Sequence, residues 1–129
     1  MGIMVRNFFI TFAVFMVIDL IWLGFIAKGL YAKYLGFIMT DKVNWVAAIT
    51  FYVLFIIGMM VFVINPSESL KQVMLLGAFF GFITYATYDL TNLATLKNWP
   101  LTITLIDLTW GTLLSFATAT ISYLIINRI

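Results

Sequence analysis

The stretch LTITLIDLTWGTLLSFATATISYLII, residues Leu101–Ile126, carries one charged residue, Asp107, among mainly apolar and hydroxyl-bearing side chains. A helix crosses the hydrocarbon core of a bilayer with about 20 consecutive, predominantly apolar residues. Three earlier stretches, about 5–27, 44–64 and 70–93, have the same character. The sequence therefore predicts an all-α polytopic membrane protein, with four transmembrane helices in one bundle and residues 1–129 forming a single domain.

The composition excludes several classes of function. Hydrophobic residues make up 64% of the chain and charged residues 9%, whereas roughly 25% of residues are charged in an average soluble domain. The lipid bilayer is therefore the expected partner. Cysteine and histidine are both absent, which excludes disulfides, thiolate chemistry and zinc sites built on these ligands. The few Lys and Arg residues are scattered, so no basic patch is available for nucleic acid.

The connections between the spans set the topology. Lys28–Val43 mixes lysines, tyrosines and apolar residues, which is typical either of a segment lying among the headgroups or of a solvated connector. Thr40-Asp41 is a candidate N-cap for the second span, and in Asn65-Pro66-Ser67-Glu68 we expect Asn65 to cap the third. An even number of spans places both termini on one side. The small lysine excess on the opposite side, with Lys28 and Lys97, favours a cytoplasmic location for that side.

Three of the five acidic residues, Asp19, Asp89 and Asp107, fall within spans. An ionised, unpaired aspartate at the centre of a span costs about 2.5–3.5 kcal/mol, so intramembrane acids usually face the bundle interior and serve a function. Counted at about 1.5 Å per residue from Lys28, Lys97 and the turn before Leu101, all three lie about 10 to 13 Å deep in the same leaflet. We therefore expect their carboxyl groups to meet in a pocket that opens towards the loop side.

Two of these aspartates belong to stripes with a four-residue spacing. Small side chains at this spacing let two helix backbones approach closely, so each stripe is expected to face another helix rather than lipid. The stripes are Gly77, Gly81, Tyr85 and Asp89 in the third span, and Asp107, Gly111, Ser115 and Ala119 in the fourth.

Aromatic and hydrogen-bonding residues surround the three acids. Trp22 and Trp110 each follow an aspartate by three residues, so acid and indole share one helix face, although both tryptophans could instead be interfacial anchors. The predicted ligand-binding residues are Asp19, Trp22, Tyr85, Tyr88, Asp89, Asn92, Asp107 and Trp110.

The acid cluster is compatible with several ligands. An all-oxygen set suits a divalent cation such as Mg²⁺, Mn²⁺ or Ca²⁺, with Asp19, Asp89 and Asp107 as candidate metal ligands. It equally suits an organic cation, to which aromatic faces add cation–π attraction. Alternatively, the acids are neutral, or paired with Lys28 or Lys97, and only join the helices.

Three segments carry a resemblance to a known family: YDLTNLATLKNWP at Tyr88–Pro100, DLTWG at Asp107–Gly111 and DLIWLG at Asp19–Gly24. Together they resemble an uncharacterised family of small bacterial four-span integral membrane proteins, a domain of unknown function. The resemblance implies four spans and residence in the bacterial cytoplasmic (inner) membrane, and it transfers no catalytic or binding role to any residue.

The sequence thus indicates a multi-pass membrane protein that binds or transports a small cation, metal ion or polar lipid headgroup through an intramembrane aspartate cluster. A lipid-modifying membrane enzyme is one alternative, with the aspartates as general acid and base or as holders of a metal. A structural or assembly subunit without a ligand is the other, and a homo-oligomer is compatible with each. Catalytic residues are not identified, and enzymatic activity is left open.

Overall fold

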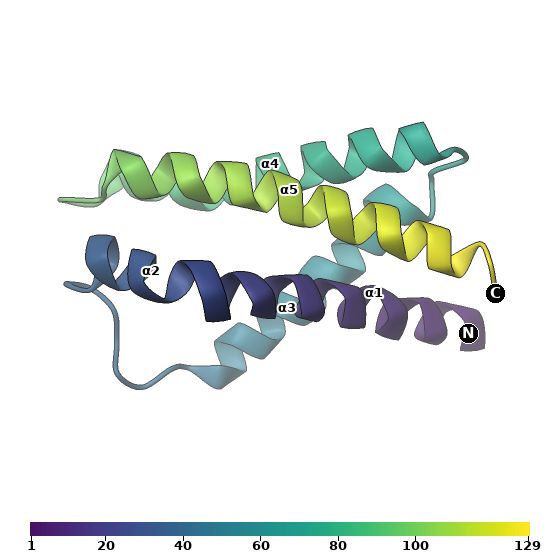
Figure 1. Cartoon of the computed structure of the whole chain (residues 1–129), viewed down its shortest axis with the longest axis horizontal. Helices are drawn as coiled ribbons and strands as arrows, with labels where there is room; N and C mark the ends of the chain where they lie inside the picture. The colour runs from purple at the N-terminus through teal and green to yellow at the C-terminus, as the bar shows by residue number, and fades with distance from the viewer.

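The computed structural model describes residues 1–129 and consists of helices joined by short connections, without strands (Figure 1). One π-helical segment, η1, lies within the first long helix and a second, η2, ends the second long helix, so the seven elements form four long continuous helices. All four are long and apolar enough to cross a membrane, which confirms the predicted fold class. The elements are α1 (Gly2–Ile21), η1 (Trp22–Ala27), α2 (Lys28–Leu35), α3 (Trp45–Met59), η2 (Met60–Ile64), α4 (Leu70–Thr95) and α5 (Leu101–Ile126).

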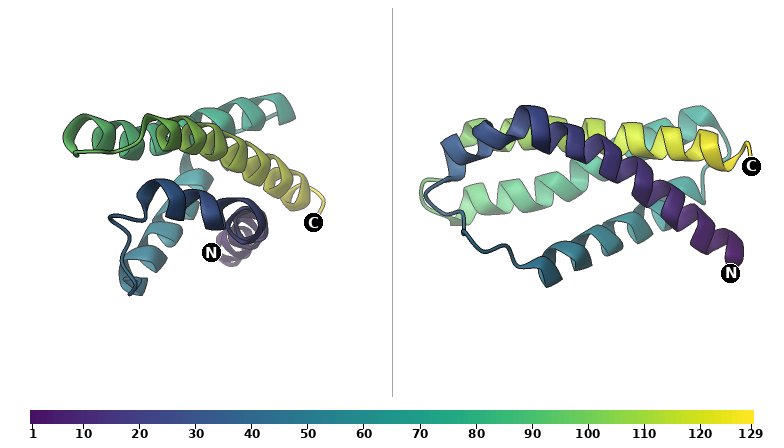
Figure 2. Two further views of the ribbon diagram at one scale, coloured as in Figure 1. Left: turned by 60° about the vertical axis from the view of Figure 1, so that its left-hand side comes forward. Right: turned by 60° about the horizontal axis from the view of Figure 1, so that its bottom comes forward.

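The four helices do not form a uniform bundle. Helices α4 and α5 form a closely packed antiparallel hairpin, and α1 lies along α5 (Figures 1 and 2). Helix α3 crosses the other helices at an angle. It contacts α1 directly, and its continuation η2 contacts α4 and α5. Both chain termini lie at the same end of the molecule, as an even number of spans requires (Figure 1).

The two predicted stripes of small residues face each other across the α4–α5 hairpin. A Cβ atom added to Gly77 would lie 2.8 Å from the Cβ of Ala119, and one added to Gly81 would lie 2.6 Å from the Cβ of Ser115. A Cβ on Gly111 would run into the ring of Tyr85. The absence of side chains at these glycines is therefore what lets the two backbones approach.

The first helix extends beyond the end that the sequence predicted at Ala27. Its buried residues recur every four positions, at Asn7, Thr11, Phe15 and Asp19. A regular α-helix has 3.6 residues per turn, so a four-residue stripe drifts around its surface. The wider π-helical turns of η1 offset this drift, and α2 continues the helix to Leu35 along the same side of the bundle. Only residues 36–44 form an exposed, non-helical connector.

The helix caps differ from those that the sequence suggested. Helix α3 is capped by Asn44 rather than Thr40-Asp41, because the Asn44 side chain accepts a hydrogen bond from the Ala47 N–H at 3.1 Å. Helix α4 is capped by Ser69 rather than Asn65, which follows the last residue of η2. Ser69 Oγ accepts from the Gln72 N–H at 3.1 Å, while the Gln72 side chain accepts from the backbone N–H of Glu68 at 2.9 Å. This reciprocal pair resembles a capping box.

Candidate functional site

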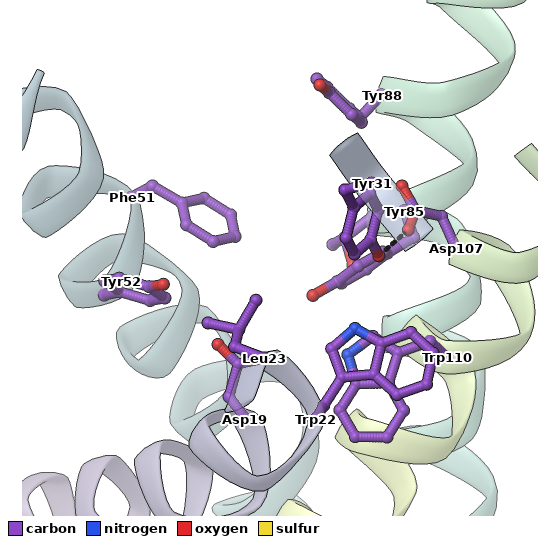
Figure 3. A pocket seen from close by; sticks show the side chains of 11 residues that line it. Asp19, Trp22, Leu23, Tyr31, Phe51, Tyr52, Tyr85, Tyr88, Asp107 and Trp110 are labelled. Atoms are coloured by element: carbon purple, nitrogen blue, oxygen red, sulfur yellow. Dashed lines mark hydrogen bonds between the residues drawn. The ribbon is translucent and has the colours of Figure 1, made fainter. Parts of the chain in front are cut away.

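A pocket of about 480 Å³ lies between the long first helix and helices α3, α4 and α5 (Figure 3). Every one of the four long helices contributes to its wall. The lining residues are Asp19, Trp22, Leu23, Tyr31, Phe51, Tyr52, Thr84, Tyr85, Tyr88, Asp107 and Trp110. Eight of these eleven residues are hydrophobic, so the two aspartates are placed in largely apolar surroundings.

The two lining aspartates come from different helices. Asp19 on α1 and Asp107 on α5 are both buried, and Tyr85 extends into the pocket between them (Figure 3). The hydroxyl of Tyr31 on α2 donates a hydrogen bond to Oδ1 of Asp107. A contact of this kind fixes the orientation of the carboxyl group, because a phenol that donates to it must lie in line with one of its oxygen atoms.

The third aspartate lies behind the pocket wall. Asp89 on α4 is fully buried with its carboxyl group next to that of Asp107, and no other side chain or backbone group donates a hydrogen bond to it. Lys28 and Lys97, the salt-bridge partners considered above, are both exposed. The pair of adjoining carboxyl groups therefore lacks a neighbouring basic side chain. Two adjacent carboxylates repel each other in a medium of low dielectric constant, and a shared proton relieves that repulsion.

Aromatic rings form most of the remaining wall. The indoles of Trp22 and Trp110 stack with their ring centroids 4.3 Å apart and their planes inclined by 9°. Across the pocket, Phe51 and Tyr52 face them from α3 (Figure 3). No lysine or arginine is among the lining residues. The surface therefore presents carboxyl groups and electron-rich ring faces, and both attract cations.

The structure brings together most of the residues that the sequence singled out. Asp19, Trp22, Tyr85, Tyr88, Asp107 and Trp110 all line the pocket. Asp89 adjoins it only through Asp107, and Asn92, half-buried one turn beyond Tyr88, does not line it.

The sequence interpretation missed the contributions of α2 and α3 to the pocket. Tyr31 was assigned to the connector after the first span, yet it lies on the four-residue stripe that leads from Asp19 through Ala27. Extending that stripe would have found it. Tyr52 is one of the few polar residues in the second span, and this could have marked it as inward-facing.

The three candidate metal ligands Asp19, Asp89 and Asp107 do not form one group in the structure. No group of three or more acidic residues is close enough to hold a metal ion. Asp19 lies across the pocket from Asp107, with Tyr85 between them (Figure 3).

One comparison identifies the family. A family model described as a predicted membrane protein (DUF2177) matches residues 4–124, almost the whole chain. The chain belongs to the DUF2177 family. This confirms the resemblance found in the sequence, and DUF2177 membership together with the four long apolar helices makes the chain a multi-pass integral membrane protein. No curated protein and no solved structure matches this DUF2177 chain.

Proposed function

We propose that this DUF2177 protein binds a small organic cation in its intramembrane pocket. The observation that carries the proposal is the pairing of two buried carboxyl groups with stacked and facing aromatic rings, in a cavity without a basic side chain. Such a lining offers a cation two kinds of attraction, and it holds no positively charged side chain to pair with an anion.

The size of the pocket supports a ligand larger than a metal ion. Its volume of about 480 Å³ lies within the range of roughly 300–1,000 Å³ that is usual for small-molecule sites. A bare Mg²⁺ or Ca²⁺ requires about six oxygen ligands at 2.0–2.6 Å, and a largely apolar wall does not provide them. A quaternary or primary ammonium group instead gains about 0.5–2 kcal/mol from each well-placed ring once it is removed from water.

The lining residues have separate roles in this proposal. Asp107, oriented by the Tyr31 hydroxyl, supplies the negative charge on one side of the pocket, and Asp19 supplies it on the other. The stacked pair of Trp22 and Trp110 provides a flat, rigid wall against which the cation packs. Asp89 acts through Asp107, because these two buried carboxyl groups can share a proton while the site is empty.

The test is a titration of the purified protein with tetramethylammonium and choline in lipid nanodiscs. Binding is followed by tryptophan fluorescence and by the shift in unfolding temperature, because a ligand that binds only the folded state stabilises it. We expect Asp107→Asn to weaken binding by at least tenfold, which corresponds to about 1.4 kcal/mol. Asp19→Asn should act in the same direction.

A matched control is available in the two acids outside the spans. Asp41 and Glu68 are exposed, and Asp41→Asn or Glu68→Gln removes the same charge without touching the pocket. Binding that falls equally in all four variants would reflect surface charge alone and would refute the site. Absence of any cation-dependent response in the wild-type protein would refute the function.

The proposal includes a location in the bacterial cytoplasmic (inner) membrane. It rests on the kind of family that the sequence resembles and on the four apolar helices. Fractionation of the native host, with the protein followed by an epitope tag at its C-terminus, tests this location.

A further inference from the structure

Packed side chains close the pocket towards α2 and α5. Towards the loop end, Leu35, Trp99 and Ile103 form a buried cluster against which Tyr31 packs. On the side of α1 and α5, the stacked indoles of Trp22 and Trp110 close the wall.

The floor of the pocket, towards the chain termini, is the main hydrophobic core. The ring centroids of Phe15 and Phe55 lie 5.4 Å apart there, and Tyr85 packs against Phe55. A ligand therefore does not reach the pocket through the middle of the bundle.

The side between α3 and α4 is open. Helix α3 contacts the rest of the molecule mainly through α1 and η2, and its first half diverges from the α4–α5 hairpin (Figure 2). Phe51 on α3 is 48% exposed and Tyr88 on α4 is 57% exposed, although both line the pocket. These two rings flank the mouth.

The depth of the mouth decides what it faces. Phe51 is six residues beyond Trp45, the first residue of α3, and Tyr88 is seven residues before Thr95, the last residue of α4. At about 1.5 Å per residue, each lies about 10 Å along its helix from the loop end. The hydrocarbon core of a bilayer is about 30 Å thick. A mouth at this depth on the flank of a spanning protein faces lipid chains.

We infer that the ligand is an amphiphilic amine drawn from the surrounding leaflet, with its cationic head between Asp19 and Asp107 and its alkyl chain leaving between Phe51 and Tyr88 into the bilayer. The inference rests on the proposed function and specifies the class of ligand and its route. The apolar chain stays in lipid throughout, so the pocket needs to accommodate the headgroup alone.

A series of alkyltrimethylammonium ions with one to twelve carbons in the variable chain tests this route in nanodiscs. Each added methylene increases partition into the bilayer about fourfold, as expected for burial of one CH₂ group. If the ligand enters from the leaflet, the apparent aqueous affinity rises by this factor at each step without levelling off. The signal from the double variant Asp19→Asn with Asp107→Asn, and from empty nanodiscs, is subtracted. The remaining signal is the binding that depends on the two acids.

The outcomes separate the inference from the proposed function. Acid-dependent binding of tetramethylammonium without any gain from a longer chain would overturn the lateral route and leave an organic-cation site that is filled from water. Absence of acid-dependent binding at every chain length would refute the proposed function, and the inference with it.

A second measurement tests the mouth directly. The chain has no cysteine, so Phe51→Cys can be labelled alone with a bulky maleimide, and Phe79→Cys, 62% exposed on α4 and outside the pocket lining, provides the matched control. We expect the label at position 51 to weaken binding of dodecyltrimethylammonium at least tenfold and the label at position 79 to leave it unchanged. Equal affinities of the two labelled proteins would contradict the proposed mouth.

Discussion

Replacing Gly81 by alanine tests whether the close approach of α4 and α5 holds the fold together. The new Cβ atom would lie 2.6 Å from both Cβ and Oγ of Ser115, and it would press on the backbone carbonyl oxygen of Gly111. Non-bonded carbon atoms prefer about 3.5–4.0 Å, so the two helices must part by about 1 Å. A backbone carbonyl cannot rotate away as a flexible side chain could.

The magnitude follows from a comparison with a second glycine. Overpacking of a tight contact costs about 1–3 kcal/mol, whereas alanine is better than glycine in a helix by about 1 kcal/mol. Gly29 in α2 has no atom within 4 Å of an added Cβ, so Gly29→Ala gains helix propensity without a clash. The propensity gain is common to both variants, and the difference between them should therefore be about 1–3 kcal/mol in the free energy of unfolding.

Equilibrium unfolding in mixed detergent micelles, followed by circular dichroism, measures this difference. We expect Gly29→Ala to be as stable as the wild type or more stable, and Gly81→Ala to be less stable than both. Equal stabilities of the two variants would refute the tight α4–α5 interface.

Three further variants probe the pocket and the opposite end of the molecule. Tyr31→Phe removes the hydroxyl that donates to Asp107 and orients its carboxyl group. We expect the loss of this orientation to weaken tetramethylammonium binding by up to about tenfold, or about 1.4 kcal/mol, and an unchanged titration would argue against a role for Tyr31. Trp22→Phe removes the indole stack with Trp110, which should cost about 0.5–1.5 kcal/mol of stability and reduce the fluorescence response to ligand; a full response would place the ligand elsewhere. Ser69→Ala removes the N-cap of α4 and should cost about 1 kcal/mol in thermal unfolding, while ligand affinity stays at the wild-type value because the cap lies at the other end of α4.

The sequence was sufficient to predict four long helices and, for α4 and α5, the face of each that packs against another helix. A long apolar stretch within a membrane is stable as a helix, because its backbone N–H and C=O groups find no water in lipid and must form hydrogen bonds with each other. The stripes that begin at Gly77 and at Asp107 were also informative, because small residues and buried acids mark the sides of a helix that avoid lipid. The structure places these stripes against each other.

The parts of the pocket that come from α2 and α3 leave a weaker signal in the sequence, carried by single residues such as Tyr31 and Tyr52. Helix α3 is apolar on most of its surface, with Thr50 and Tyr52 as its hydroxyl-bearing side chains, and it has no charged residue. Hydrophobic contacts alone do not select a face in a bilayer, since lipid chains are as apolar as leucine. Its divergence from α4 and α5, which creates the pocket mouth, is therefore a property of the packed structure. The π-helical turn η1 is equally invisible in the local sequence, and it helps to place Tyr31 beside Asp107.

The most direct test of the central claim is to identify the residues that contact a bound cation. A quaternary ammonium ion carrying a small diazirine is photolysed with the protein in nanodiscs, and the adducts are mapped by mass spectrometry. An organic-cation site in the pocket predicts adducts on residues such as Trp22, Tyr52 and Tyr88, and their loss in the presence of excess tetramethylammonium. Adducts on outward-facing residues such as Phe79, undiminished by the competitor, would contradict it.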